Sequence, residues 1–123
     1  MLLDSNIIIY SAVPEYISLL SPYTSNEQNA ASLLTKVEVL GFHRLQSEDK
    51  ERFQRVFSSL SLIPIDVETI ERAIELRSQK KMSLGDAVIA ATAVRRELPL
   101  VTRNTKDFDW IDGLELANPF VVA

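Results

Sequence analysis

The chain begins MLLDSNIIIY (residues 1–10), a short apolar run that stops at an acidic residue. Residues 1–3 are all apolar, which predicts a short buried strand, and Asp4 with the two polar residues after it predicts a turn or the start of a helix. A carboxylate directly after a buried strand lies where open α/β sheets bind their ligands. The same carboxylate also suits the N-cap of the next turn, and Asp4 taken alone slightly favours capping.

Strand signals recur along the rest of the chain. The segments AASLL (30–34) and LPLVT (98–102) predict buried strands. SLIPI (61–65) predicts an edge strand because of its proline, and GLELANPF (113–120) predicts a last, short edge strand.

Helix signals lie between these strands. A short helix is expected over 15–20, within a stretch that otherwise has a loop-like composition, and another is expected to begin at Thr35. The remaining predicted helices are 47–60 with Ser47 as N-cap, 66–81 with Asp66 as N-cap, and 83–96 with Ser83 as N-cap. The last helix is expected to bury a stripe made of Leu84, Ala87, Val88, Ala91 and Val94.

Strands that alternate with helices predict an α/β fold with a mainly parallel central sheet flanked by helices. The 123 residues predict one domain over 1–123, which buries roughly two-thirds of its unfolded surface. No apolar run approaches the roughly 20 residues of a membrane span, and no secretory signal is expected. The absence of cysteine excludes disulfides and thiolate metal sites, and it fits a cytoplasmic protein.

The net charge is −4, whereas a nucleic-acid binder is normally basic. Four acids, however, sit at the edges of apolar segments: Asp4, Glu38, Asp86 and Asp107. Without these four, 13 of the 17 acidic residues remain against 13 basic residues. Two bound divalent ions would therefore cancel the excess, so the composition permits phosphate binding.

Each of these acids also has a structural interpretation. Thr35-x-x-Glu38 matches a capping box, which is the favoured interpretation of Glu38 in isolation. Asp86 lies three residues after Ser83 and flanks the apolar stripe, so capping and ligand binding are evenly balanced there. Asp107 follows a predicted strand and also suits the cap of a short helical turn.

Four acids at element junctions together favour a shared site. Oxygen ligands without cysteine suit a hard divalent ion such as Mg²⁺ or Mn²⁺, and this indicates phosphate chemistry. The single histidine, His43, excludes a paired-histidine mechanism and is expected at the surface. Asn6, Thr102 and Asn104 offer polar groups beside the acids, and Arg103 and Lys106 are placed to contact a phosphate backbone.

The segments LLDSNIIIY, LLTKVEVLGF, SLGDAVIAATAV and LPLVTRNTKDF, in this order, resemble the PIN-domain nucleases, and specifically the VapC-like toxins of prokaryotic toxin–antitoxin systems. The resemblance implies a parallel α/β fold and a Mg²⁺- or Mn²⁺-dependent endoribonuclease that cuts RNA, is inhibited by a cognate antitoxin and is commonly a homodimer. It assigns an acidic quartet to Asp4, Glu38, Asp86 and Asp107, with Asp4, Asp86 and Asp107 as metal ligands. Asn6, Thr102 and Asn104 match the polar residues that accompany the quartet.

Two other functions remain open at this stage. A haloacid-dehalogenase-like phosphotransferase also places a nucleophilic aspartate after its first strand, but it needs a second acid where this chain has Asn6. A PIN-like module without catalytic activity would keep the acids only as caps. The complete acidic set argues against this second alternative.

Overall fold

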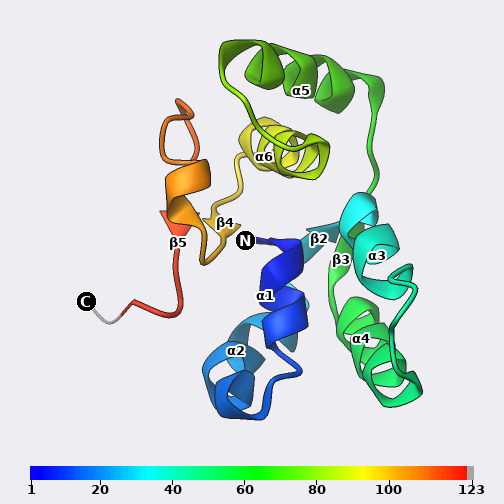
Figure 1. Cartoon of the computed structure of the whole chain (residues 1–123). Helices are drawn as coiled ribbons and strands as arrows, with labels where there is room; N and C mark the ends of the chain where they lie inside the picture. The colour runs from blue at the N-terminus through cyan, green and yellow to red at the C-terminus, as the bar shows by residue number, and fades with distance from the viewer. Residues whose placement is uncertain (122–123) are drawn as a thin grey trace.

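The computed structural model describes residues 1–121 and contains a five-stranded sheet between two layers of helices (Figure 1). All neighbouring strands are parallel, which confirms the predicted α/β class. In spatial order, the strands are β3 (Ser61–Ile63), β2 (Ala30–Ser32), β1 (Leu2–Leu3), β4 (Leu100–Val101) and β5 (Leu116–Ala117). The strands β3 and β5 form the two edges, as their sequences predicted.

Six α-helices and two short 3₁₀ helices connect the strands within the described residues. The helices are α1 (Ser5–Tyr10), α2 (Ile17–Thr24), α3 (Leu33–Leu40), α4 (Ser47–Ser59), α5 (Val67–Gln79) and α6 (Leu84–Arg96), with the 3₁₀ helices η1 (Pro14–Tyr16) and η2 (Thr105–Asp107). None of the helices in residues 1–121 combines the length and apolarity that a membrane crossing requires.

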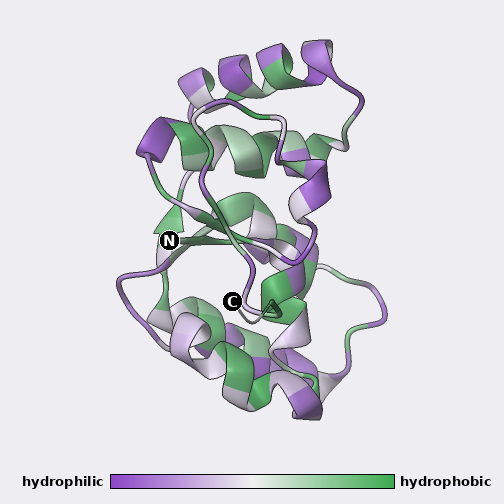
Figure 2. Ribbon diagram, turned by 90° about the vertical axis from the view of Figure 1, so that its left-hand side faces the viewer, coloured by the Kyte–Doolittle hydropathy of each residue, from purple (hydrophilic) through white to green (hydrophobic). Residues whose placement is uncertain are grey.

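The pleat of the sheet divides the apolar residues into two cores. Leu2 and its neighbours in the sheet pack with α5 and α6, whereas Leu3 and its neighbours pack with α1, α2, α3 and α4. The helices of the two cores lie on opposite sides of the sheet in Figure 1, and Figure 2 shows hydrophobic residues along the strands between them. Both strand faces are buried, which explains why these strands are continuous apolar runs.

The order of the strands reverses at the centre of the sheet. From β1 the chain moves outward through β2 to β3, and then returns to place β4 on the other side of β1. The carboxyl ends of β1 and β4 therefore lie side by side at a topological switch point, where open α/β sheets form their ligand sites. Asp4 follows β1, and Thr102 follows β4.

Helix α6 packs closely on the sheet because its buried face is made of small residues. Ala87, Ala90 and Ala91 are completely buried. The prediction that Leu84 belongs to the buried stripe is wrong, since its side chain is 63% exposed. Leu84 is the first residue of α6 and faces an open groove beside Ile70 instead of the sheet.

Two of the three predicted N-caps are confirmed. The side chains of Asp66 and Ser83 accept hydrogen bonds from backbone N–H groups in the first turns of α5 and α6. Ser47 is not an N-cap, because α4 begins at Ser47 itself and Gln46 takes the cap position. The first turn closes when the Lys50 N–H donates to the carbonyl of Gln46, at 2.9 Å.

Helix α2 differs from its predicted range of 15–20. It begins at Ile17 after a 3₁₀ turn and continues through Pro22 to Thr24. Pro22 lacks the N–H that would bind the carbonyl of Ser18, and the helix ends two residues later. Side chains bind two of the last carbonyls of the helix. Ser25 Oγ donates to the carbonyl of Ser21 and Asn29 Nδ2 to that of Tyr23, at 2.6 and 3.0 Å.

Asp66 joins α5 to α6, and this predicts a pH-dependent contribution to stability. Hydrogen bonds from the Thr69 hydroxyl and N–H, and then from Arg95, lower its pKa from 3.8 to about 2. A carboxylate whose folded pKa is depressed stabilises the fold above its unfolded pKa and loses this contribution as the pH falls through the folded pKa. The stability advantage of wild type over Asp66→Asn should therefore be full above pH 4 and should shrink between pH 4 and pH 2.

Denaturant unfolding at several pH values measures this difference. Glu75→Gln is the matched control, because the Glu75 side chain forms only an exposed pair with Arg72. An exposed ion pair contributes about 0–1 kcal/mol to the free energy of unfolding. An Asp66→Asn deficit that stays constant from pH 5 to pH 2 would contradict the assignment to charge.

Candidate active site

Asp4 occupies the switch point and is almost completely buried, with 4% of its surface exposed. It stands at the N-cap position of α1, but its side chain makes no capping hydrogen bond. The carboxylate instead accepts a hydrogen bond from Thr102 Oγ1, at 2.9 Å. The capping interpretation of Asp4 is therefore wrong, and its carboxylate is oriented from the neighbouring strand end.

Thr102 is fully buried, and its hydroxyl both donates and accepts a hydrogen bond. The Asn104 N–H donates to Thr102 Oγ1 at 3.1 Å, so the hydroxyl proton points at Asp4. This arrangement fixes Asp4 without neutralising it. The side chains of Asn6, on α1, and Asn104, after β4, are exposed.

Glu38 is placed by α3, which begins two residues earlier than predicted. Ser32 is the N-cap, since its Oγ accepts from the Leu34 N–H at 3.1 Å. Thr35 is inside the helix and completely buried, so the predicted capping box is wrong. Ser5 Oγ donates to Glu38 Oε1 at 3.0 Å and lies 3.2 Å from Thr35 Oγ1.

Gly85 brings α6 against the Glu38 carboxylate. A Cβ atom at Gly85 would lie 3.0 Å from Glu38 Oε2, which is closer than an ordinary van der Waals contact. The missing side chain therefore allows Glu38 to approach the first turn of α6, where Asp86 is the next residue. Glu38 and Asp86 are thus neighbours in space although α3 and α6 are far apart in the sequence.

Asp86 and Asp107, the remaining two acids of the candidate site, come from α6 and η2. Asp86 is half-buried in the first turn of α6, and its N–H donates to Ser83 Oγ at 3.1 Å. Asp107 ends η2 and is exposed. Both residues line one groove of about 520 Å³.

The ionisation of the buried acids reflects this crowding. Burial raises the pKa of Asp4 from 3.8 to about 6; the bond from Thr102 opposes the shift, and the charges of Asp86 and Glu38 add to it. The pKa of Asp86 is also raised, first by burial and then by the charge of Asp107. The pKa values of Asp4 and Asp86 therefore depend in part on the charges of the other predicted acids.

The donor set fits a hard divalent cation, because all four candidate groups are carboxylates and the deepest one is costly to ionise alone. No three acidic, histidine or cysteine side chains in residues 1–121 stand close enough, as they are oriented, to hold one ion. Glu38 and Asp107 are exposed. Three of these carboxylates could therefore share an ion only in side-chain orientations other than those of this structure.

Sequence reasoning missed Ser5 and Gly85. Ser5 follows Asp4 directly, and its position suggested only a helix start. Gly85 lies inside the SLGDAVIAATAV segment, and its role depends on a contact with α3 that no local pattern reports. His43 is exposed, as expected.

The family model for the PIN domain matches residues 1–114 of the chain. The chain belongs to the PIN domain family. This membership agrees with the resemblance seen in the sequence. It does not favour a haloacid-dehalogenase-like enzyme.

Individual relatives agree with this family assignment. The chain is 31% identical over 88 residues to a protein named ribonuclease VapC from Rickettsia bellii (strain RML369-C), and the match covers 63% of this chain and 66% of that protein. Among solved structures, a toxin–antitoxin complex from Klebsiella pneumoniae is similar, with 36% identity, 98% coverage of both chains and a TM-score of 0.77. VapBC2 from Rickettsia felis, bound to a DNA fragment from its promoter, has 26% identity, 95% and 96% coverage and a TM-score of 0.75.

The raised pKa of Asp4 predicts a gain in stability when its charge is removed. An acid with a folded pKa of about 6 and an unfolded pKa of 3.8 leaves stability unaffected below pH 4 and costs stability progressively as the pH rises through 6. In chelator, Asp4→Asn should therefore be more stable than wild type at pH 8, by up to about 3 kcal/mol. The difference should disappear below pH 4.

Chemical denaturation across this pH range tests the expectation. Asp112→Asn removes the same charge from an exposed site and should show no such pH-dependent gain. An Asp4→Asn variant that is less stable than wild type at pH 8 in chelator would contradict the cost assigned to the buried carboxylate.

Proposed function

We propose that this PIN domain is a Mg²⁺- or Mn²⁺-dependent endoribonuclease that hydrolyses RNA phosphodiester bonds and acts as the toxin of a toxin–antitoxin pair in the cytoplasm. The observation that carries the proposal is the buried Asp4 carboxylate at the switch point, held by Thr102 and influenced by the charges of Asp86 and Glu38. A structural cap does not need a costly buried charge with three further acids around it.

In this proposal Asp4, Asp86 and Asp107 hold the cation, and Asn6, Thr102 and Asn104 support them. When bound, Mg²⁺ or Mn²⁺ supplies positive charge to the phosphate oxygens and lowers the pKa of a water molecule. Thr102 keeps the Asp4 carboxylate aimed at the site through the 2.9 Å hydrogen bond. Side chains fixed in this way need little reorganisation during the reaction.

Glu38 has a different role because Ser5 occupies one of its oxygens. Its second oxygen, Oε2, faces the first turn of α6 beside Asp86. We assign to this oxygen the orientation of the attacking water by a hydrogen bond. Attack by water in line with the leaving oxygen yields 5′-phosphate and 3′-hydroxyl ends, since no 2′-hydroxyl takes part.

The relatives support the biological setting of this activity. One bears the name ribonuclease VapC, and two solved neighbours above 25% identity are a toxin–antitoxin complex and VapBC2. We extend the RNA substrate and the antitoxin partner to this chain. A groove of about 510 Å³ beside Glu38 suits an apolar segment of an antitoxin, because Ile9, Val13 and Phe42 line it.

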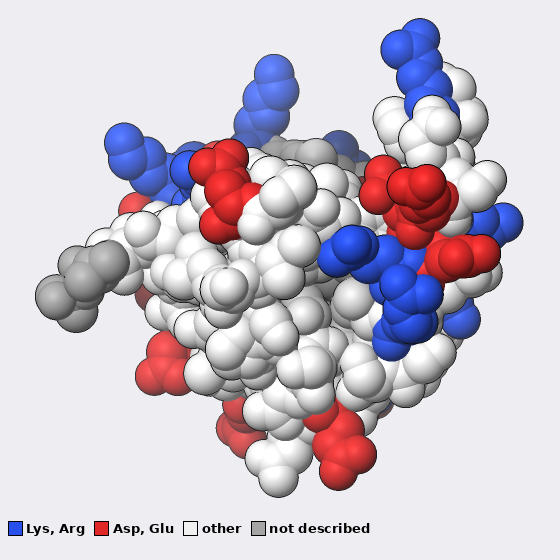
Figure 3. Space-filling model, turned by 90° about the horizontal axis from the view of Figure 1, so that it is seen from below, with Lys and Arg blue, Asp and Glu red and all other residues white. Residues whose placement is uncertain are grey.

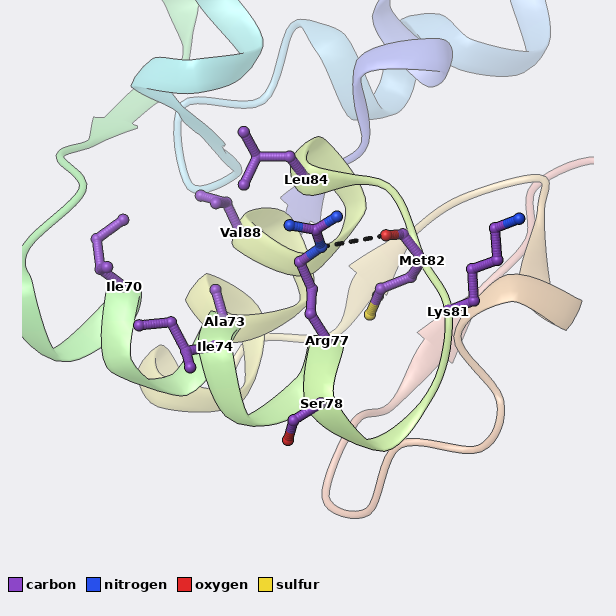
Figure 4. A pocket seen from close by; sticks show the side chains of 9 residues that line it. All are labelled: Ile70, Ala73, Ile74, Arg77, Ser78, Lys81, Met82, Leu84 and Val88. Carbon is purple, nitrogen blue, oxygen red and sulfur yellow. Dashed lines mark hydrogen bonds between the residues drawn. The ribbon is translucent and has the colours of Figure 1, made fainter.

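A homodimer is also part of the proposal. Helix α5 exposes Val67, Ile70 and Ile74, and Ile70 and Ile74 border a groove of about 490 Å³ shared with Leu84 of α6 (Figure 4). Two copies related by a twofold axis can bury this surface against itself. Antiparallel pairing of α5 then brings the acidic first turn of one copy near Arg77 of the other.

A charge in the centre of this surface is expected to prevent dimerisation. Ile74→Lys should convert a dimer into a folded monomer, as measured by light scattering coupled to gel filtration. Val37→Lys is the control, because Val37 is a similarly exposed apolar residue on α3. An Ile74→Lys protein with the same mass as wild type would exclude this dimer surface.

Neutral variants of the acids test the activity itself. Asp4→Asn and Asp86→Asn should abolish Mg²⁺-dependent RNA cleavage, with a loss of at least about 100-fold, while circular dichroism shows a folded protein. Asp112→Asn should keep wild-type activity, since Asp112 is an exposed acid outside the cluster. Wild-type rates in either of the first two variants would reject the catalytic role, and inactivity of wild type on all RNA would favour a binding module.

A further inference from the structure

Arg103 stands in the chain between two residues that organise the candidate site. The Thr102 hydroxyl before it binds the Asp4 carboxylate, and the Asn104 N–H after it donates to the same hydroxyl. Arg103 itself is exposed. A contact that holds this arginine therefore also holds the short segment that orients Asp4.

The guanidinium of Arg103 lies over three aromatic rings from separate parts of the chain. Its central carbon is 4.2 Å from the centroid of the Phe120 ring, and 5.3 and 5.6 Å from those of Tyr10 and Tyr16. These distances are within the range of cation–π interactions, and a planar guanidinium also stacks on such rings. The sequence suggested that Arg103 contacts a phosphate backbone, but in the structure its guanidinium is engaged by the protein itself.

The three rings form a cluster in which each ring meets the others edge to face. The centroid of Phe120 lies 5.5 Å from that of Tyr10 and 5.0 Å from that of Tyr16, with interplanar angles of 72° and 87°. Tyr10 ends α1, Tyr16 ends η1, and Phe120 follows β5. All three pack against the core that α1, α2, α3 and α4 share, so the cluster fixes the segment after β5 on that side of the sheet.

The segment after β5 also holds the end of β4 through hydrogen bonds. The Thr102 N–H donates to the carbonyl of Ala117 at 3.0 Å, and Asn118 Nδ2 donates to the carbonyl of Arg103 at 3.4 Å. Asn118 Oδ1 in turn accepts from the Phe120 N–H at 3.0 Å. Residues 117–120 therefore hold Thr102 and Arg103 through the backbone as well as through the aromatic cluster.

Aromatic rings, and no acid among residues 1–121, hold the Arg103 side chain. The salt bridges of this part of the chain involve Arg72 and Arg95. Figure 3 shows the molecule from below, which is the side of α2 in Figure 1, and large uncharged areas separate the acidic and basic side chains there. Holding the arginine with rings adds no further negative charge to the acids of the candidate site, where each added charge would raise the cost of ionising Asp4.

We propose that Arg103 and Phe120 are positioning residues of the candidate site, because their stacking holds segment 102–104 so that the Thr102 hydroxyl stays aimed at Asp4. The inference rests on the proposed ribonuclease activity and adds two residues that act through Thr102. Three contacts connect Phe120 to Asp4: the ring on the guanidinium, the peptide bond from Arg103 to Thr102, and the hydrogen bond to the carboxylate. A displacement of about 1 Å at a reacting group can slow catalysis by about 100-fold, so this distant ring matters for the rate.

Hydrogen exchange measured by NMR tests the positioning without any metal or RNA. In chelator, Phe120→Ala should speed exchange of the Thr102 and Asn104 amides by at least about 10-fold, because local opening of this segment becomes easier. Phe120→Tyr keeps the ring and should restore slow exchange. The Ala30 amide, which donates to the Met1 carbonyl on the far side of β1, should be unchanged and reports that the fold is intact.

Steady-state kinetics distinguishes positioning from a phosphate contact. Arg103→Ala and Phe120→Ala should each lower kcat for an unstructured RNA by about 10- to 100-fold, with KM changed less than about 3-fold. The double variant should be no slower than the slower single variant, since both changes remove one interaction. A phosphate contact would instead raise KM in Arg103→Ala alone and lower the slope of log affinity against log salt concentration by about 0.7.

Two matched controls separate this role from charge and from general packing. Arg55→Ala removes an exposed arginine from α4, and Tyr23→Ala removes a partly buried ring that packs against the same core from α2. Both variants should keep the wild-type kcat and the wild-type exchange of the Asn104 amide.

The possible outcomes separate this inference from the proposed activity. Wild-type exchange and kcat in Phe120→Ala would overturn the positioning role and leave the ribonuclease standing. A raised KM confined to Arg103→Ala, or equal losses in Tyr23→Ala, would also overturn it, in favour of a phosphate contact or of general destabilisation. A wild-type protein that cuts no RNA, although Phe120→Ala alters exchange at Asn104 as expected, would overturn the proposed activity and leave the structural link between Phe120 and segment 102–104.

Discussion

The hydrogen bond from Thr102 to Asp4 is the interaction on which the candidate site depends. It joins the ends of β1 and β4, the two parallel strands at which the order of the strands reverses. An ionised carboxylate in this buried position is unfavourable unless something compensates its charge, and one hydroxyl compensates it only in part, since the pKa stays raised at about 6. The fold thus maintains an anion that is costly by itself and well suited to a cation.

The surrounding structure determines which groups come close to the buried carboxylate. Helix α6 packs closely on the sheet because its buried face consists of alanines. Gly85 leaves room for the Glu38 carboxylate at the first turn of α6. Ser5 then holds Glu38 from α1. Acids from separate segments consequently face one region.

Much of the fold was predictable because it depends on local patterns. The parallel α/β class, both edge strands, and the caps at Asp66 and Ser83 follow from hydrophobic periodicity and from side chains within one turn. The errors arose where a local pattern had competing solutions. Thr35-x-x-Glu38 satisfies the rule for a capping box, yet Ser32 caps α3 and Thr35 is buried. Leu84 fits an apolar stripe, but it faces a groove at the start of its helix.

The sequence by itself indicated the strands and most of the helices, and it singled out Asp4, Glu38, Asp86 and Asp107 as candidate site residues, because periodicity and chain breaks act over a few residues. It did not place Glu38 correctly, since this residue lies inside α3 and not at its start. Only the tertiary structure decided which acid is buried, which hydroxyl binds it, and that Glu38 meets α6 at Gly85. These properties depend on contacts between residues as much as 98 positions apart. The energy of a charge is set by its solvent exposure and its neighbours, and both arise only when the chain has packed.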